Sequence, residues 1–313
     1  MLRFASRSRR RLIAALVGAA ALAATAARAD DFLGGDWTTG DGYRGFDVKA
    51  GVNLDSRGDW EGGATYAYDH SYAGTESRAR ELSLGVVHRM DAAWSSRFSL
   101  TGWRDNLNDV DYVGPSFGFT YVRYDDPSSP DRRARLKVSF DSDLFDFIAN
   151  ETTAPKTIRL TRTSTATIAG DQSSVSVAQW HPYFTVELPL DGGRVSPWIL
   201  VGHDFYSKNP ELIEERAGRP QFSTSANSLN GLVGGLVQNT DEVGINVRLP
   251  WRLRATASLG VEQIATDNTW ATTQSAGLSG WAGEHLKLAV SWSRSIQDGV
   301  PQELLNGGLT WFF

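Results

Sequence analysis

One local pattern in the sequence is associated with enzymatic chemistry, the pentapeptide Gly-Pro-Ser-Phe-Gly at residues 114–118. It matches G-x-S-x-G, in which a sharp turn between a strand and a helix exposes a nucleophilic serine. Residues 119–121, Phe-Thr-Tyr, continue a β pattern instead, and no helical periodicity follows them. Because the strand–turn–helix context is missing, we interpret the match at Ser116 as coincidental and predict no catalytic residue.

The residues that usually bind metals show no ligand spacing. Cysteine is absent, and the five histidines are scattered through the chain at His70, His88, His181, His203 and His285. Two pairs of carboxylates, Asp109 with Asp111 and Asp141 with Asp143, share one side of a strand and have the chemistry of a calcium site. Such pairs more often face water or a polar interior. We therefore predict neither a metal nor a cofactor.

The elements that must position these residues alternate between apolar and polar side chains with a period of two. Alternation of this kind is typical of β-strands with two different faces, and almost no segment has the 3.6-residue period of a helix. The clearest alternating segments are 46–54, 81–86, 135–141, 243–249, 253–262, 286–293 and 304–313. The sequence therefore predicts an all-β fold.

Composition narrows the all-β class. The 313 residues are 41% hydrophobic with a mean hydropathy of −0.30, which excludes a protein built from many transmembrane helices. The chain nevertheless holds 11 Trp, 9 Tyr, 14 Phe and 31 Gly, and this aromatic content excludes a disordered protein. A transmembrane β-barrel combines these properties, because only alternate residues of each strand meet lipid.

The connections between the alternating segments favour an antiparallel up-and-down transmembrane barrel. Short turn-rich connections alternate along the chain with longer polar ones, as the two ends of an outer-membrane barrel require. About thirteen strands can be counted, whereas bacterial single-chain barrels have an even number. Either residues 31–39 form an additional strand, or one connection is misread. We predict 12–14 strands.

The first 29 residues have the order of a secretory signal peptide. Arginines precede an apolar run over 12–24, and Ala27-Arg28-Ala29 forms a cleavage site. We expect a cleaved signal peptide at 1–29, a short N-terminal segment at 30–42 and the barrel at 43–313. Cleavage removes six arginines and no acid, which leaves 25 basic and 36 acidic residues and a net charge of −11. A nucleic-acid partner is therefore not expected.

The last ten residues alternate with Leu305, Leu309, Trp311 and Phe313 on one face, and the sequence ends on that phenylalanine. This strand resembles the C-terminal strand of bacterial outer-membrane barrels. The resemblance implies an outer-membrane location, contact with outer-membrane lipid and lipopolysaccharide, and recognition of Leu309, Trp311 and Phe313 by the barrel-assembly machinery.

A second resemblance covers residues 117–313. The segments 117–124 and 196–203 and the closing strand are similar to strands of autotransporter translocator domains. Residues 30–42 leave no space for an exported passenger before the first clear strand, so we expect a porin-like or autotransporter-like barrel without a passenger.

The strand parity also predicts which charged residues line the interior. If the apolar face meets lipid, the opposite face carries the following pore-lining candidates: Arg133, Arg135, Lys137, Asp141, Asp143, Arg248, Arg252, Arg254, Glu262 and Lys287. The arginines flank two short turns and would give one mouth a positive potential that favours anions. The alternative is an occluded interior in which these arginines pair with Asp and Glu.

Three classes of function remain open. A wet interior predicts a passive, porin-like channel for small solutes or anions. A plugged barrel predicts a structural or adaptor protein that serves an export or surface-assembly system, with an envelope partner at its loops. The third class is an outer-membrane lipid-modifying enzyme. The connections at 148–173 and 206–227 either fold inward as a constriction or reach a partner.

Overall fold

A computed structural model describes residues 31–71, 76–125, 133–152, 156–159, 165–168, 172–213, 236–266 and 268–313 of the chain. The predicted signal peptide at 1–29 lies outside these residues and stays a prediction. No helix in the described ranges is long and apolar enough to cross a membrane.

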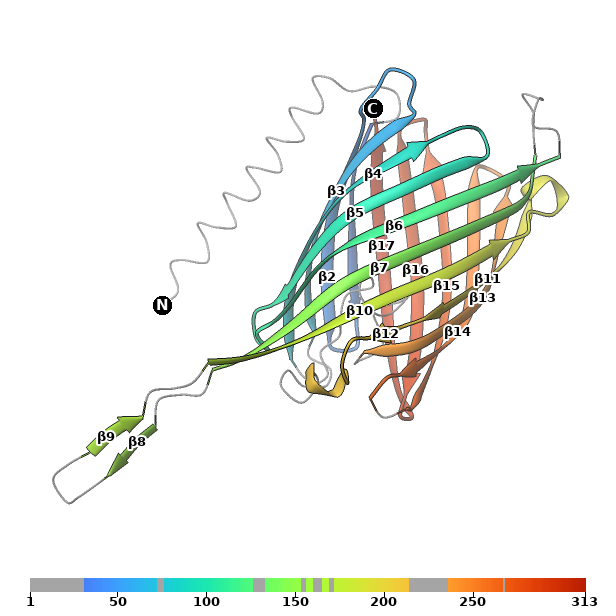
Figure 1. Cartoon of the computed structure of the whole chain (residues 1–313). Coiled ribbons are helices and arrows are strands. Elements are labelled where there is room, and N and C mark those ends of the chain that lie inside the picture. The colour runs from blue at the N-terminus through green and yellow to red at the C-terminus, as the bar shows by residue number, and fades with distance from the viewer. Residues whose placement is uncertain are drawn as a thin grey trace.

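The structure is a closed antiparallel barrel of fourteen strands, which confirms the predicted up-and-down barrel (Figure 1). Two short strands, β11 and β12, both pair with β10 and form one barrel strand interrupted at Asp204. The barrel strands are β1 (Phe32–Gly40), β2 (Tyr43–Asn53), β3 (Trp60–Ser71), β4 (Ser77–Arg89), β5 (Trp94–Asp105), β6 (Val110–Tyr124), β7 (Ala134–Thr152), β10 (Gln172–Glu187), β11 (Val195–His203) with β12 (Phe205–Tyr206), β13 (Val237–Leu249), β14 (Leu253–Ile264), β15 (Trp270–Ala282), β16 (Leu286–Gln297) and β17 (Val300–Phe312).

The first and last strands close the barrel. β1 pairs with β17 along its whole length, from Phe32 opposite Phe312 to Gly40 opposite Leu304. The barrel therefore begins at Phe32, and the prediction that 30–42 is a separate segment before a barrel at 43–313 is wrong. The additional strand at 31–39 was the correct alternative. Gly34 and Gly35 interrupt its apolar alternation, which weakens the strand pattern in the sequence.

The two ends of the barrel differ in their connections. The end that carries Asp31 and Phe313, here called the terminal end, also holds the β2–β3, β4–β5, β6–β7, β10–β11, β13–β14 and β15–β16 connections. The opposite end is here called the loop end. The connections predicted there are long, but those in the structure differ in length. β1–β2 and β16–β17 are tight turns at Asp41-Gly42 and Asp298-Gly299, and both glycines have positive φ angles. Asp-Gly is a typical hairpin-turn dipeptide, so these two connections are short although the predicted alternation requires long ones at this end.

The connection between β7 and β10 leaves the barrel at the loop end. It contains a separate two-stranded sheet of β8 (Lys156–Arg159) and β9 (Thr165–Ile168), which lies beyond the wall in Figure 1. The predicted long connection at 148–173 thus reaches outward in the residues described, as a partner-binding loop would.

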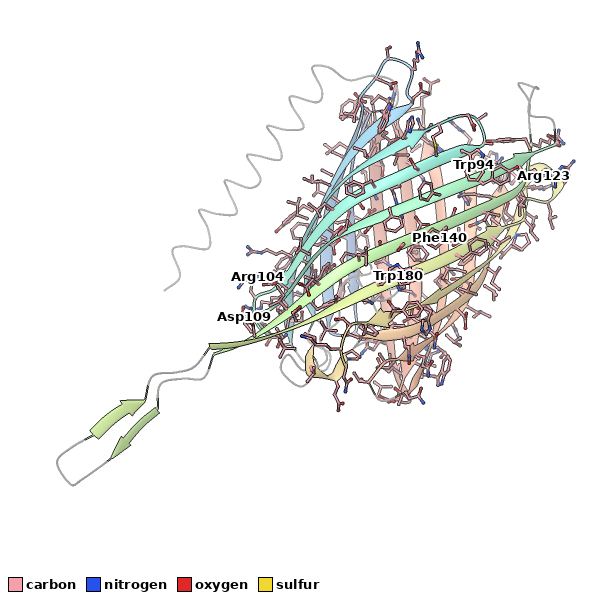
Figure 2. All side chains as sticks on the ribbon, viewed as in Figure 1. Trp94, Arg104, Asp109, Arg123, Phe140 and Trp180 are labelled. Atoms are coloured by element: carbon pink, nitrogen blue, oxygen red, sulfur yellow. The ribbon has the colours of Figure 1, made fainter. Side chains whose placement is uncertain are left out.

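The outer surface of the wall is apolar. Alternate side chains along a strand point to opposite faces, and the outward set includes exposed pairs such as Leu82 and Leu84 on β4. Figure 2 shows Trp94, Phe140 and Trp180 on this surface. Near the terminal end, Trp94 packs against Tyr121 with ring centroids 4.7 Å apart. Such an aromatic girdle over an apolar band is what a lipid environment requires.

An apolar cluster occupies the lumen at the loop end. Inward-facing side chains of β4, β5, β6, β7 and β10 pack there against Ile213 and Leu236, which stand at the described ends of the β12–β13 connection. Both residues are completely buried. The cluster consists of Ala79, Trp103, Val110, Tyr112, Phe145, Phe147, Ala149, Val177, Ile213 and Leu236. The described ends of this connection therefore fold inward, as one of the two predicted arrangements requires.

Candidate functional site: the barrel lumen

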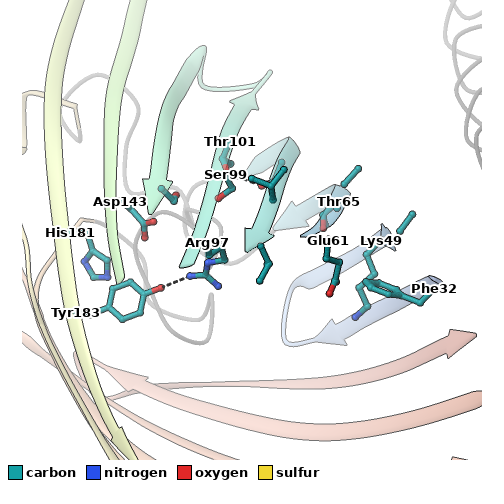
Figure 3. Close-up of a pocket in the computed structure, with 18 of the residues that line it drawn as sticks. Phe32, Lys49, Glu61, Thr65, Arg97, Ser99, Thr101, Asp143, His181 and Tyr183 are labelled. Atoms are coloured by element: carbon teal, nitrogen blue, oxygen red, sulfur yellow. Dashed lines mark hydrogen bonds between the residues drawn. The ribbon is translucent and has the colours of Figure 1, made fainter. Parts of the chain in front are cut away.

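The lumen beyond the apolar cluster contains a polar cavity of about 430 Å³ (Figure 3). Small residues on β3, β4, β5 and β6 form much of its wall because the inward positions of these strands are mostly glycine, serine and threonine. These lining residues are Gly63, Thr65, Ser83, Gly85, Ser99, Thr101 and Ser116. Longer polar side chains from β2, β5, β7 and β10 enter the same space. The wall therefore combines room for a solute with groups that can bind one.

Arg97 is the central charged residue of the cavity. Its Nη2 donates a hydrogen bond to Asp141 Oδ1 at 2.6 Å and lies 3.5 Å from the hydroxyl oxygen of Tyr183. Arg97 is on β5 and Asp141 on β7, so the ion pair crosses β6. Gly118 of β6 permits this contact because a Cβ atom there would lie 2.0 Å from Asp141 Oδ1. Figure 3 shows Arg97 pointing toward Tyr183 across this part of the lumen.

A second polar group lies on β10 beside the first. His181 Nδ1 is 2.7 Å from Asp204 Oδ1, and Gln179 Nε2 donates to the same oxygen at 2.6 Å. Asp204 is almost completely buried at the interruption between β11 and β12. A buried carboxylate is stable only when it is paired and hydrogen-bonded, and these two contacts satisfy Oδ1, whereas Asp204 Oδ2 is buried with no hydrogen-bond partner among the described residues. This group holds the wall together and leaves the His181 ring beside the cavity.

The opposite side of the lumen, formed by β1, β2 and β3, is mostly acidic. Asp36 and Asp47 stand in register on β1 and β2, and Lys49 forms an ion pair with Asp36. Closer to the loop end, the Tyr43 hydroxyl donates a hydrogen bond to Asp69. The lumen therefore has an acidic side that carries one lysine and, across from it, a side centred on Arg97.

The terminal mouth is basic and incompletely paired. Arg248 and Arg254 stand directly opposite each other on the inward face of β13 and β14. Among the residues described, no acidic side chain lies within 4.0 Å of either guanidinium or of the Lys287 ammonium. Like charges placed opposite each other in a sheet repel, so this pair produces a positive potential that attracts anions.

The other basic residues near this mouth have partners. Arg135 Nη2 is 3.7 Å from Asp125 Oδ2, and Lys137 Nζ is 3.9 Å from Glu187 Oε2. These pairs are at least partly exposed to the lumen, and ion pairs in contact with water contribute little stability. Each pair has no net charge, so the positive field of the mouth comes mainly from the residues without a described acidic partner, Arg248, Arg254 and Lys287.

The structure brings most of the predicted pore-lining residues together in two groups. Arg133, Arg135, Lys137, Arg248, Arg252, Arg254 and Lys287 lie toward the terminal end, and Asp141 and Asp143 lie in the middle of the lumen. Arg252 is in the β13–β14 turn, with its guanidinium carbon 5.3 Å from the Trp281 ring centroid. Glu262 faces inward but has no exposed surface, so it is buried in the wall and does not line the cavity. Whether the other residues line a conducting pore stays a prediction.

Several lumen residues were not among the predicted set, including Arg97, Tyr183 and His181. Strand parity predicts that Arg97 faces inward, because Phe98 and Leu100, which alternate with the inward positions of β5, face outward. His181 and Tyr183 follow from parity only after β10 is placed, and the sequence leaves 157–190 ambiguous. Asp204, the partner of His181, lies outside any regular strand, so periodicity has no signal for it.

The remaining predicted positions lie in the wall. Ser116 is in the middle of β6 with its side chain mostly buried, which agrees with a coincidental G-x-S-x-G match. Leu309 and Trp311 face outward on β17 and are about half exposed, and the Phe313 amide donates to the Asp31 carbonyl at 3.0 Å. Their recognition by an assembly machinery stays a prediction. No cluster of three potential metal ligands occurs in the described part of the chain.

Comparison with known proteins identifies the fold. No protein-family model matches the chain, and no curated protein matches it. Among solved structures, the CymD monoaromatic hydrocarbon channel is similar over 90% of this chain and 88% of its own, with 12% identity and a TM-score of 0.52. The KdgM porin aligns with 90% of this chain and 99% of its own, at 10% identity and a TM-score of 0.43. Omp33 of Acinetobacter baumannii aligns with 91% of this chain and 98% of its own, at 8% identity and a TM-score of 0.43. The chain is a β-barrel of the bacterial outer-membrane type.

Proposed function

We propose that this barrel is a passive outer-membrane channel for small solutes that passes anions in preference to cations. The observation that carries the proposal is the cross-strand couple of Arg248 and Arg254 at the terminal mouth, which has no acidic partner in the part of the chain that the structure describes. A ring of positive charge beside a low-dielectric wall concentrates anions and repels cations at an entrance. The short turns favour the periplasm as the location of this mouth.

The middle of the lumen supports the same proposal. An anion that passes the mouth reaches a cavity lined by hydroxyl groups and by the Arg97 guanidinium. Because Arg97 is already paired with Asp141, it can donate to a passing solute without holding it as tightly as a free guanidinium. Weak binding at successive sites is what conduction requires. The proposal includes no enzymatic step.

One observation favours a second candidate function, the structural or adaptor barrel. The apolar cluster covers the inner face of β4, β5, β6, β7 and β10 at the loop end, and β8 and β9 project beyond the wall where a partner protein can reach them. A barrel sealed at this end would hold surface partners and conduct nothing. Conductance separates the two functions.

The test is a planar-bilayer recording of the purified protein under a KCl gradient. For the wild type, we expect stepwise increases in current and a reversal potential whose sign indicates selectivity for anions. Arg248→Gln combined with Arg254→Gln should shift the reversal potential toward cation selectivity, because the two positive charges are removed. Arg123→Gln is the matched control, because Arg123 faces outward near the same end and should leave selectivity unchanged. Complete absence of current from folded protein would favour the adaptor function.

A further inference from the structure

The outward face of the barrel carries a group of arginines at the loop end. Arg44 on β2, Arg78 and Arg80 on β4, and Arg104 on β5 are all exposed on the side of the wall that otherwise meets lipid. These four residues are here called the arginine patch. Figure 2 shows Arg104 on the outer surface at this end, far from Arg123 and Trp94 near the terminal end. The arginine patch is therefore positively charged and lies at the loop end, whereas the aromatic girdle lies near the terminal end.

The strand register brings the patch residues side by side. Arg44 aligns with His70 of β3, and His70 aligns with Arg78 of β4. Arg80 stands directly opposite Arg104 on β5. Opposed like charges destabilise a sheet unless an anion lies between them. The placement therefore points to a negatively charged ligand on the outer surface.

Nearby acidic groups occupy only part of the patch. Arg78 Nη2 is 3.0 Å from Glu76 Oε1, and Arg104 Nη2 is 3.0 Å from Asp109 Oδ1. Hydrogen bonds from His70 and Arg78 hold the pKa of the Glu76 carboxyl below its usual range, so this carboxyl stays ionised. Arg78 Nε also donates to His70 Nε2 at 3.3 Å. Each guanidinium has five donors, so these contacts leave donors on Arg78 and Arg104 available.

Arg44 and Arg80 have no such partner. Within the described ranges no acidic side chain lies within ion-pairing distance of either guanidinium. Asp111 stands opposite Arg104 in the strand register and is the remaining acid beside the patch. Arg44 and Arg80 are therefore the two guanidinium groups most available to an anion from outside the chain.

The surroundings of the patch identify the kind of anion. Immediately below Arg80 on the same face lie Leu82 and Leu84, both more than half exposed, and Phe46 lies below Arg44. An outward position between an apolar band and the loop end is the level of lipid head groups. The ligand must therefore present acyl chains to the leucines and phosphate to the arginines. Arginine suits this task because its planar fork matches phosphate oxygens.

We propose that the arginine patch binds the phosphate groups of lipid A in the outer leaflet of the outer membrane. Lipid A presents two phosphates at opposite ends of a disaccharide above several acyl chains, which matches a patch spread over the neighbouring strands β2 to β5 above an apolar band. The proposal rests on the outer-membrane fold and is independent of whether the lumen conducts.

The test measures binding of diphosphoryl lipid A to the full chain in detergent by isothermal titration calorimetry. Arg44→Gln combined with Arg80→Gln removes the two guanidinium groups that lack a described acidic partner, so folding should be preserved. We expect affinity to fall about fivefold for each arginine removed, because a basic residue at a lipid surface contributes about that factor. Arg123→Gln should bind as the wild type does. Heat-dependent gel mobility verifies that each variant is folded.

Titrations with two other lipids identify the source of the phosphate. Monophosphoryl lipid A should bind more weakly than the diphosphoryl form, and phosphatidylglycerol in mixed micelles should bind more weakly still. Equal affinity of the double variant and the wild type for diphosphoryl lipid A would overturn the proposal. Equal binding of phosphatidylglycerol and diphosphoryl lipid A by the wild type would also overturn it, because the patch would then attract any anionic lipid.

Discussion

At the scale of single residues, the lumen depends on where side chains are absent. The ion pair between Arg97 and Asp141 connects β5 to β7 across β6, and it exists because Gly118 has no side chain between them. Tyr183 lies opposite Asp141 on β10 and extends the same contact by one strand. Gly118 thus allows polar side chains of β5, β7 and β10 to contact one another in the lumen.

Gly118→Ala should therefore destabilise the barrel. The new Cβ would lie 2.0 Å from Asp141 Oδ1, so the carboxylate must rotate away from Arg97. We expect the free energy of unfolding to fall by about 1–3 kcal/mol, the usual cost of overpacking. Urea unfolding followed by tryptophan fluorescence in lipid vesicles measures it. Gly102→Ala is the control, because a Cβ there meets nothing within 4 Å; equal losses in both variants would show that space at Gly118 is unimportant.

Neighbouring residues on one strand face different solvents. Val138 of β7 is in register with Tyr121 and Val186 on the outward face, whereas Lys137 faces the lumen beside Glu187 of the neighbouring strand β10. The same change of charge should thus have different effects at two consecutive positions.

Val138→Arg should impair folding, but by less than the about 2–4 kcal/mol that an arginine costs on the lipid face at the bilayer midplane, because Val138 lies beside Tyr121 near the terminal end. Lys137→Glu should leave folding intact because the lumen is wet at that position. The folded fraction is measured by the mobility difference between unboiled and boiled samples in gel electrophoresis. Similar losses in both variants would mean that the inward and outward faces of β7 are wrongly assigned.

At the scale of elements, the decisive contact is the pairing of β1 with β17. Every hydrogen-bonding group of an edge strand must be satisfied inside a membrane, so a barrel of this kind is stable only when closed. β1 has nine residues and is the shortest uninterrupted strand of the wall, and its pairing with β17 extends over all nine. Defects at this seam should therefore affect assembly more than defects elsewhere.

Phe313→Asp should reduce the amount of assembled barrel in the outer membrane. The Phe313 amide still reaches the Asp31 carbonyl, but the apolar side chain at the end of the closing strand is replaced by a charge. Loss of apolar contact for one phenylalanine corresponds to about 1.5–3 kcal/mol. Phe313→Leu keeps an apolar group and should assemble normally. Immunoblots of heat-shifted outer-membrane fractions measure both, and normal assembly of the aspartate variant would contradict the proposed role of this residue.

At the scale of the whole molecule, the lumen is divided along its axis. The terminal end is basic and open to a polar cavity, whereas at the loop end apolar side chains of β4 to β10 pack against the described ends of the β12–β13 connection. Conduction through the barrel therefore depends on how firmly Ile213 and Leu236 stay in the apolar cluster.

Ile213→Asp should increase conductance. The isoleucine has no exposed surface, and an unpaired carboxylate at such a site is strongly unfavourable. The end of the connection should then leave the cluster and widen the lumen, which planar-bilayer recordings would register as larger current steps. Glu211→Gln is the control, because Glu211 is exposed two residues earlier in the same segment. Unchanged current steps in the aspartate variant would show that this contact does not limit the pore.

The sequence alone determined the barrel class and the two faces of most strands, because a period of two directs alternate side chains to lipid or to lumen whatever their neighbours are. It also determined which arginines enter the terminal mouth, since Arg248 and Arg254 flank a recognisable turn. It left the strand count open, because Gly34 and Gly35 conceal β1, and it gave no sign that the inward-facing Glu262 is buried, because parity specifies direction but not burial.

Only the tertiary structure decided which side chains meet across the lumen. The contact of Arg97 with Asp141 joins residues 44 positions apart and depends on Gly118 of an intervening strand. The contact between His181 and Asp204 depends on the interruption between β11 and β12, where Asp204 lies. Such contacts follow from barrel closure and from the shift between neighbouring strands, and a local periodicity contains information on neither.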